Sequence, residues 1–430
     1  PAGAGLGSST CNLVKNVVGA SALALPGGVA TFSASKSALI PSIGLTCALG
    51  GLSGYCFSLI GRSCAATKSD TIGEAWSRTI GDKSSWIPTA TSISMCVAAC
   101  IAFSVILGDI VTDLAVTFAL PAIFTQRRVG LGLLASVALF PLCLLENLKP
   151  LQYTSVLGVG GTFYTAAVMA LRYFDGSYAP GGRFYDLIAA SARPRFEGTG
   201  LILLVYTFMC GALNPLALML VSMLSTSFVA HYNAPTFYSE LKNKSVPRYN
   251  FVVGAGYAIS VLVGSAMMCF PFLTFGGNCL GFIINNYHTT DLLATLSRVA
   301  IGVSLTFGYP LSFIPMRDGI LRSLGYSKPG KKTVRLATLL MVTLFTTVGI
   351  LIRNLGFVIA FSGAVLGSLI AYIFPALMWM AKCGKDKKAG QKLAGWRKAE
   401  FLGQYGVIGI GVVMGVLGAG ISVLETFVWK

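Results

Sequence analysis

Long runs of apolar residues recur along the whole chain, separated by short segments that carry most of the charge. A membrane-spanning helix needs about 20 predominantly apolar residues. Strands of a membrane β-barrel would instead alternate apolar and polar side chains over about ten residues. The pattern therefore predicts an all-α polytopic membrane protein with 11 transmembrane helices. The predicted spans are residues 9–34, 38–61, 87–112, 129–146, 151–173, 214–240, 249–275, 290–315, 334–352, 355–381 and 402–426.

The composition agrees with this class. The 430 residues are 54% hydrophobic and only 11% charged, whereas soluble domains carry about 25% charged residues. A surface so poor in charge must face lipid, which excludes a cytosolic enzyme, a secreted disulfide scaffold and a disordered protein. The net charge of +17 raises the question of a nucleic-acid partner, which the placement of the basic residues answers.

The basic residues concentrate in segments that would lie on one side of the membrane. These segments are 62–83, 242–248, 317–335 and 382–398. Cytoplasmic loops are enriched in Lys and Arg, so we predict that the N-terminus is cytoplasmic and the C-terminus lies on the opposite side. The positive charge then serves orientation and contact with membrane lipid, and we expect no nucleic-acid partner.

Residues 174–213 are the difficult part of this topology. The segment would be an outer loop, yet it carries four arginines, and its apolar run 201–213 is too short to span. We interpret that run as an interfacial or re-entrant piece, because a further span here would invert every segment that follows.

Two predicted spans contain residues that interrupt a helix. In span one, the small residues Gly19–Ala22 precede Pro26, which lacks a backbone donor. In span six, a His, a Tyr, an Asn and a Pro fall within residues 231–235. A broken helix is tolerated in lipid only where it is buried in protein or lines a cavity. Small residues also serve close helix packing, so span one by itself leaves both interpretations open.

The two interrupted spans are five helices apart, which is typical of transporters built from inverted repeats. The run from Asn12 to Pro26 is similar to the segment N-x-x-x-x-x-x-G-x-[GS]-x-L-x-L-P of the amino acid/auxin permease family. Residues 227–242, SFVAHYNAPTFYSELK, resemble that family's span-six signature. Residues 298–317 and 353–376 resemble its spans eight and ten. The resemblance covers essentially the whole chain and is strongest to the sodium-coupled neutral and the vacuolar amino acid transporter branches.

The resemblance implies a leucine-transporter-like fold, a 5+5 inverted repeat with broken helices 1 and 6. The first repeat would cover residues 1–173, the outer loop 174–213 and the second repeat 214–381. Residues 382–430 would form a basic loop and a peripheral helix 11.

The resemblance also implies a substrate site at the two interruptions. The carboxylate of an amino acid would meet backbone N–H groups, and a helix N-terminus favours an anion on physical grounds. The α-amino group would meet carbonyls at the second interruption. Packing alone can also explain small residues at these positions. The predicted substrate-binding residues are Gly19, Ala20, Ser21, Ala22, Ser225, Thr226, Ser227 and Phe228.

The resemblance implies an ion site between spans one and eight, formed in sodium-coupled members by a span-eight Thr and a span-one Asn. Thr306 matches the Thr, and Ser304 lies beside it, but Lys15 stands in place of the Asn. An ammonium there would repel Na⁺ and could occupy the site itself, as in the proton-coupled branch. The His that this branch carries three residues earlier is Asn12 here. Lys15 can alternatively snorkel to the membrane surface.

One further intramembrane charge is a candidate for coupling. Asp109 lies toward the end of predicted span three. A carboxylate within a membrane span is costly, so its presence indicates a functional role. It could pair with Arg298, carry a proton, or reach the outer water. Na⁺ and H⁺ both remain possible coupling ions, with H⁺ slightly favoured, and no other cofactor is expected.

Catalytic patterns are missing from the sequence. The chain has two His and no phosphate-binding G-x-x-x-x-G-K-[ST] motif. We therefore predict a protein that is not an enzyme, and the family resemblance implies a secondary active transporter of small or neutral amino acids that works by alternating access. The alternative is a protein of transporter fold that acts as an amino acid sensor or as an accessory subunit of a membrane complex. An ion channel is a third hypothesis.

Overall fold

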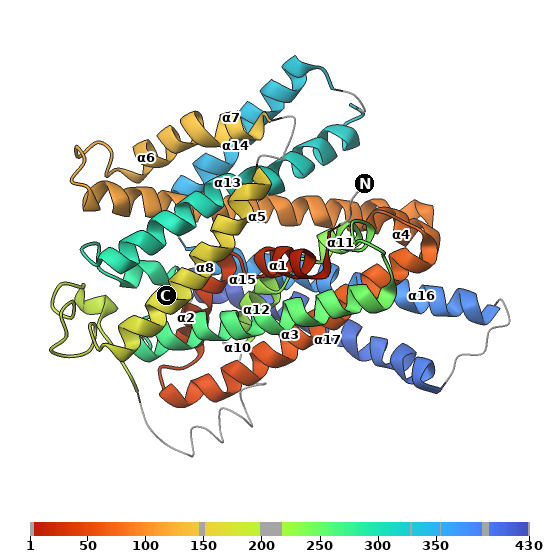
Figure 1. The fold of residues 1–430 in the computed structure, drawn as a ribbon, viewed down its shortest axis with the longest axis horizontal. Helices are drawn as coiled ribbons and strands as arrows, with labels where there is room; N and C mark the ends of the chain where they lie inside the picture. The colour runs from red at the N-terminus through yellow and green to blue at the C-terminus, as the bar shows by residue number, and fades with distance from the viewer. Residues whose placement is uncertain are drawn as a thin grey trace.

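The computed structural model describes residues 4–145, 151–197, 217–326, 329–352, 354–388 and 395–428. Within these ranges the chain is almost entirely helical, and extended pairing is limited to two isolated bridges, Ala4 with Leu241 and Arg195 with Gly276. Figure 1 shows the long helices crossing the view from one end of the molecule to the other.

Predicted span one is broken in the structure. It consists of α1 (Leu6–Val17), the 3₁₀ turn η1 (Ala20–Ala24) and α2 (Leu25–Phe32). The axes of α1 and the segment Ser21–Phe32 are bent by 42°. Pro26 stands at the start of α2, where a missing N–H has no helical partner to lose.

Among the described residues, seven further helices are long and apolar enough to cross a membrane, and the bent pair of span one raises the number to eight. They are η2–α3 (Lys36–Ala38, Leu39–Thr67), η3–α5 (Asp82–Ser84, Trp86–Thr117), α12 (Val246–Phe275), α13 (Leu292–Ser323), α14 (Lys331–Leu351), α15–α16 (Leu355–Ser362, Phe374–Lys388) and α17 (Gly395–Phe427). Two π-helical turns, η8 (Gly363–Gly367) and η9 (Leu369–Ile373), connect α15 to α16.

The three remaining predicted spans are helical but do not pass the same test within the described residues. Span four consists of α6 (Arg127–Leu134), the π-helical turn η4 (Ala135–Leu139) and α7 (Phe140–Cys143). Span five is α8 (Leu151–Phe174). Span six is interrupted between α10 (Ala217–Ser227) and α11 (Ala234–Ser239), with the 3₁₀ turn η6 (His231–Asn233) between them. The apolar run 201–213 lies outside the described residues.

The other described elements are short helices between the spans. They are α4 (Ile72–Thr79), η5 (Ala190–Ala192) and η7 (Ile283–Asn286).

Segments predicted to be cytoplasmic contact one another at one end of the molecule. The N–H of Ala4 donates to the carbonyl of Glu240 (2.9 Å), and the Lys385 ammonium donates to the carbonyl of Arg78 (2.8 Å). In Figure 1, α4, α11 and α16 lie at this end, on the right of the view. These contacts bring the N-terminal segment to the end of α11 and the end of α16 to α4; the side of the membrane on which this end lies stays a prediction.

Segments predicted to be external meet at the opposite end, around the buried carboxylate of Asp291. It accepts two hydrogen bonds from Arg172 (2.8 and 2.6 Å) and one from the Tyr178 hydroxyl (2.9 Å). Burial raises the pKa of Tyr178, so its hydroxyl stays protonated and continues to donate. Asp291 also caps α13 by accepting from the N–H of Leu293 (3.1 Å). One carboxylate thus ties the outer loop to α8 and α13.

The broken helix α1–α2 lies in the middle of the bundle. α13 packs against α5 and α8, while α12 packs against α1, α3 and α8. α10 packs against α2 and α17. The close contact with α17 depends on glycine, because a Cβ at Gly418 would lie 2.4 Å from Oγ of Ser222. This arrangement surrounds both interruptions with protein.

Candidate functional site

The interruption of span one exposes backbone donors. α1 ends at Val17, and Gly19 is extended, with φ −105° and ψ −161°. Its N–H donates to the carbonyl of Val17 (3.0 Å). η1 begins at Ala20, and the first N–H groups of a helix have no internal acceptors; the N–H of Ser21 makes no other hydrogen bond to the described residues. These donors form the kind of backbone site that binds a carboxylate.

The interruption of span six leaves polar groups in a buried place. The carbonyl of Phe228 accepts from the Tyr257 hydroxyl (3.1 Å), and the Thr226 hydroxyl donates to the carbonyl of Ile359 (2.7 Å). Ser225 is fully buried beside Gly367, where a Cβ would lie 3.3 Å from its Oγ. The buried hydroxyl of Ser227 has no partner among the described residues. Two of the four predicted positions are therefore engaged with neighbouring elements.

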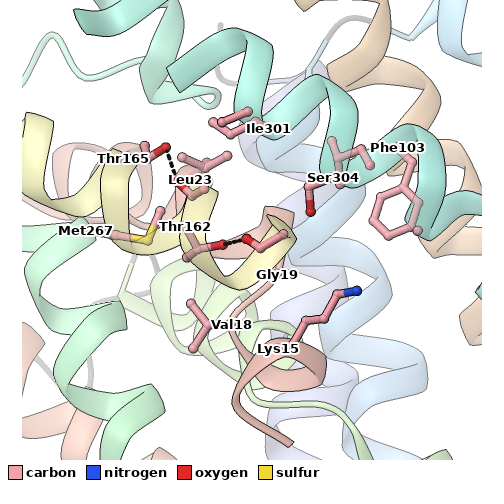
Figure 2. A pocket seen from close by; sticks show the side chains of 15 residues that line it. Lys15, Val18, Gly19, Leu23, Phe103, Thr162, Thr165, Met267, Ile301 and Ser304 are labelled. Carbon is pink, nitrogen blue, oxygen red and sulfur yellow. Dashed lines mark hydrogen bonds between the residues drawn. The ribbon is translucent and has the colours of Figure 1, made fainter. Parts of the chain in front are cut away.

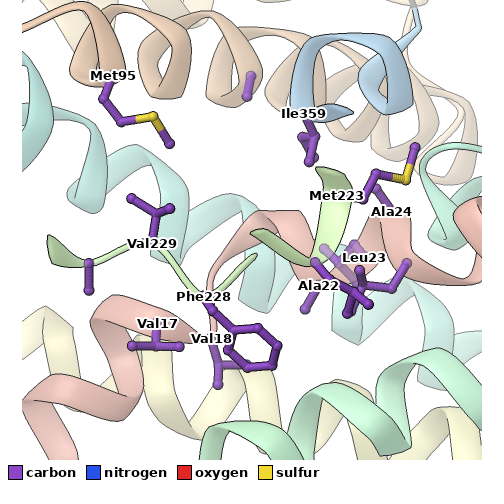
Figure 3. Packing of buried hydrophobic residues seen from close by; sticks show 14 of the residues in the cluster. Val17, Val18, Ala22, Leu23, Ala24, Met95, Met223, Phe228, Val229 and Ile359 are labelled. Carbon is purple, nitrogen blue, oxygen red and sulfur yellow. The ribbon is translucent and has the colours of Figure 1, made fainter. Parts of the chain in front are cut away.

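The two interruptions lie next to each other, because η1 packs against α10. Figure 3 shows the side chains between them, with the Phe228 ring beside Val18. All of the labelled side chains are apolar: Val17, Val18, Ala22, Leu23, Ala24, Met95, Met223, Phe228, Val229 and Ile359. The predicted substrate-binding segments thus come together in a region closed by apolar side chains.

A cavity of about 100 Å³ lies on the other side of the first interruption. Its lining residues come from α1, the first interruption with η1, α5, α8, α12 and α13. They include Lys15, Gly19, Leu23, Phe103, Gly158, Gly161, Met267 and Ser304. Figure 2 shows the Lys15 side chain extending toward Ser304 and Phe103. No hydrogen bond or ion pair of the Lys15 ammonium is recorded among the described residues.

Lys15 and Ser304 approach each other across Gly158. A Cβ at that glycine would lie 2.5 Å from Oγ of Ser304 and 3.3 Å from Cε of Lys15. The sequence interpretation did not include Gly158, although the glycines at 158 and 161 share one face of α8. That spacing is the pattern in the sequence that indicates a close approach of α8 to neighbouring helices.

The structure separates the two predicted span-eight residues. Ser304 lines the cavity with Lys15 and Thr306 does not. Two residues along a helix correspond to a rotation of about 200°, so the two side chains project from different faces of α13. Of these two residues, Ser304 is the one at the cavity, and the part of either residue in ion coupling stays a prediction.

Asp109 lies away from both interruptions. Its carboxylate forms an ion pair with Arg127 of α6 and accepts from the Asn285 side chain (3.1 Å). Arg298 instead pairs with Asp113 (2.8 Å), one helical turn from Asp109. Of the three alternatives raised for Asp109, pairing with Arg298 is therefore not the one that the structure shows. The tertiary fold brings α6 against α5, and spacing along the sequence contains no sign of that contact.

A buried polar chain holds the second interruption against α3. His231 Nε2 hydrogen-bonds to the carbonyl of Ser53 (3.0 Å), and the Ser53 hydroxyl hydrogen-bonds to the Tyr372 hydroxyl (3.1 Å). His231 and Tyr372 are fully buried. The costly His of span six is thus a structural link to α3 and to the helix that carries the π-helical turns.

Two solved structures share this architecture. The structure aligns with that of MhsT in complex with L-phenylalanine at a TM-score of 0.56 and 13% identity, covering 96% of this chain and 98% of that one. It aligns with a Na⁺-coupled sialic acid symporter at a TM-score of 0.53 and 13% identity, covering 97% and 87%. The arrangement of the helices is therefore the fold of these two structures.

The family model for transmembrane amino acid transporter proteins matches residues 2–422, and the chain belongs to this family. Vacuolar amino acid transporter 5 of Schizosaccharomyces pombe is 24% identical over 87% of this chain and 84% of its own length. A human relative, named as number 11 of the sodium-coupled neutral amino acid transporters, is 23% identical over 63% of this chain and 61% of its own length. The predicted family membership is confirmed, and with it a transporter rather than an enzyme.

Proposed function

We propose that the chain is a secondary active amino acid transporter that works by alternating access through eleven transmembrane helices. The observation that carries the proposal is the packing of two helix interruptions against each other, at η1 and at the end of α10. Each interruption lies in the first helix of a predicted repeat, 1–173 or 214–381. Residues 174–213 connect the repeats, and 382–430 add a basic loop and helix 11.

The substrate would be a small or neutral amino acid. Its carboxylate would bind the N–H groups of Ala20 and Ser21, with the Ser21 hydroxyl as a further donor. Its α-amino group would bind carbonyls of the second interruption, near Ser225 and Ser227. The labelled side chains between the interruptions are apolar, which favours a substrate without a charged side chain.

The coupling ion would be H⁺ rather than Na⁺, with Lys15 as the group that occupies the ion site. Lys15 lines the cavity between α1 and α13 together with Ser304. A protonated amine there places a fixed positive charge where a bound Na⁺ would otherwise lie, and losing its proton would remove that charge. The sodium-coupled relative and structural neighbour make Na⁺ the competing ion, which experiment can decide.

Alternating access would move the helices that hold the interruptions against α5, α8 and α13. The apolar side chains between the breaks would separate to admit substrate. The N-terminus would lie on the cytoplasmic side, at the end where the basic segments gather.

Uptake of labelled amino acids into proteoliposomes tests the proposal when pH and Na⁺ gradients are imposed independently. We expect accumulation driven by an inward proton gradient in Na⁺-free buffer. Accumulation that requires Na⁺ would overturn H⁺ as the proposed coupling ion and leave the transport proposal standing.

Absence of uptake under either gradient would overturn the transport proposal. Thermal stabilisation by an amino acid in that case would identify a sensor. Ion conductance that persists without substrate would identify a channel instead.

A further inference from the structure

A larger cavity lies far from the interruptions, at the end where the basic segments gather. It holds about 640 Å³ between the end of α7, the C-terminal part of α13 and the start of α14. Its polar lining residues are Arg317, Asp318, Arg322, Tyr326, Lys331 and Arg335. Nothing in the proposed transport cycle uses this cavity.

The cavity has an excess of positive charge. Asp318 is the one acidic side chain among the described lining residues, and it pairs with Arg317 (2.8 Å). Arg317 is only 6% exposed and also donates to the carbonyl of Cys143 (2.9 Å) and to the Thr338 hydroxyl (3.1 Å). Arg317 is therefore held rigidly in the floor of the cavity.

The remaining basic side chains lie at the exposed rim. Arg322 donates to the backbone carbonyl of Asp318 (3.2 Å). This hydrogen bond orders the guanidinium group without neutralising its charge. Arg322 and Arg335 are both exposed. Guanidinium groups match the geometry of phosphate oxygens and bind them bidentately. The rim is therefore suited to a phosphate rather than to a cation.

An apolar surface continues from the rim along α14. Leu336, Leu340 and Leu344 follow one another every four residues on this helix and are 58%, 61% and 57% exposed. Side chains at that spacing share one helix face. Apolar residues also line the cavity itself, among them Ile314 and Val334. A molecule that fits both parts has an anionic phosphate at one end and hydrocarbon at the other.

We propose that this cavity binds the head group of an anionic phospholipid, whose acyl chains lie along the leucine face of α14. Basic pockets between transmembrane helices bind anionic head groups in this way. A free phosphate would use the arginines but leave the leucine face without a role, and for this reason a lipid is the occupant.

Native mass spectrometry of the purified full chain tests the proposal by titration with phosphatidic acid, phosphatidylglycerol and phosphatidylcholine of identical acyl chains. The two anionic lipids are expected to bind more tightly than phosphatidylcholine. The double variant Arg322→Gln/Arg335→Gln should lose roughly tenfold or more in affinity for them, because each basic side chain near a membrane surface contributes about fivefold.

The matched control is Lys242→Gln/Lys244→Gln, which removes the same charge from exposed residues at the same end of the molecule. It should bind anionic lipid like the unmodified protein. Equal loss in both double variants would overturn a defined site and leave only a nonspecific charge effect. Equal binding of phosphatidylcholine, or displacement of the lipid by glycerol 3-phosphate or inorganic phosphate at matched concentration, would overturn the lipid as occupant.

Discussion

Lys15 of α1 and Ser304 of α13 meet at the bare backbone of Gly158. A Cβ atom at that glycine would lie 3.3 Å from Cε of Lys15 and 2.5 Å from Oγ of Ser304. Three helices from distant parts of the sequence therefore depend on the smallest residue at one point. Because this point lines the cavity that would hold the coupling charge, it provides the sharpest tests of the proposed transporter.

Replacing Lys15 tests whether its ammonium replaces a metal cation. Lys15→Asn should abolish proton-driven uptake or create a dependence on Na⁺, because the fixed charge is gone and an amide oxygen becomes available. Uptake in proteoliposomes over a range of pH and Na⁺ concentrations measures this change. Lys36→Asn at the outer end serves as the control. Unchanged kinetics and pH dependence in Lys15→Asn would leave only a snorkelling role for Lys15.

Adding one methyl group at Gly158 should impair the site. Overpacking costs about 1–3 kcal/mol, so Gly158→Ala should reduce both uptake and thermal stability. Gly160→Ala is the matched control on the same helix, because a Cβ there meets nothing within 4 Å.

The double variant Gly158→Ala/Ser304→Ala should recover much of the stability that Gly158→Ala loses. It removes the hydroxyl at 2.5 Å, and the Ser304 Cβ at 3.5 Å is an ordinary contact. A thermal stability no higher than that of the single variant would contradict the approach of the two side chains.

The pair between Arg298 and Asp113 should be a major structural element of the outer end. Arg298 is 1% exposed and also donates to the carbonyls of Ile284 (2.9 Å) and Tyr287 (2.6 Å). Arg298→Gln should destabilise the protein by about 1–3 kcal/mol, because it removes hydrogen bonds to two buried carbonyls and one partner of a partly buried ion pair. Thermal unfolding in detergent measures the loss, with the exposed Arg128→Gln as the control. Similar melting temperatures in both variants would refute this role.

The hydroxyl of Tyr372 should position the second interruption through Ser53 and His231. Tyr372→Phe removes one hydrogen bond, which costs about 1 kcal/mol of stability. It should lower maximal uptake by more than the loss of folded protein explains. The control is Tyr405→Phe on α17, where the Tyr is 59% exposed; it should change neither the stability nor the maximal uptake. If uptake by Tyr372→Phe falls only in proportion to the folded fraction, the role is merely structural.

Much of the fold follows from local patterns. The predicted spans are helical over most of the residues that the structure describes, because in lipid the backbone must satisfy its own hydrogen bonds. The predicted interruptions at Gly19 and at His231 are present in the structure as changes of helix type. The number of spans was harder to predict, since span four contains a π-helical turn and span six is divided into short pieces. By length and composition these described segments do not count as single spans.

The sequence by itself determined the class of protein, the family and the two places where helices break. Apolar length, proline and small residues act over a few neighbouring positions, so a linear pattern can reveal them. Only the tertiary structure decided which charges pair, Asp109 with Arg127 and Arg298 with Asp113, and that Lys15 shares a cavity with Ser304 rather than with Thr306. These pairings depend on which helix faces are turned toward each other, and that rotation is set by packing over the whole bundle.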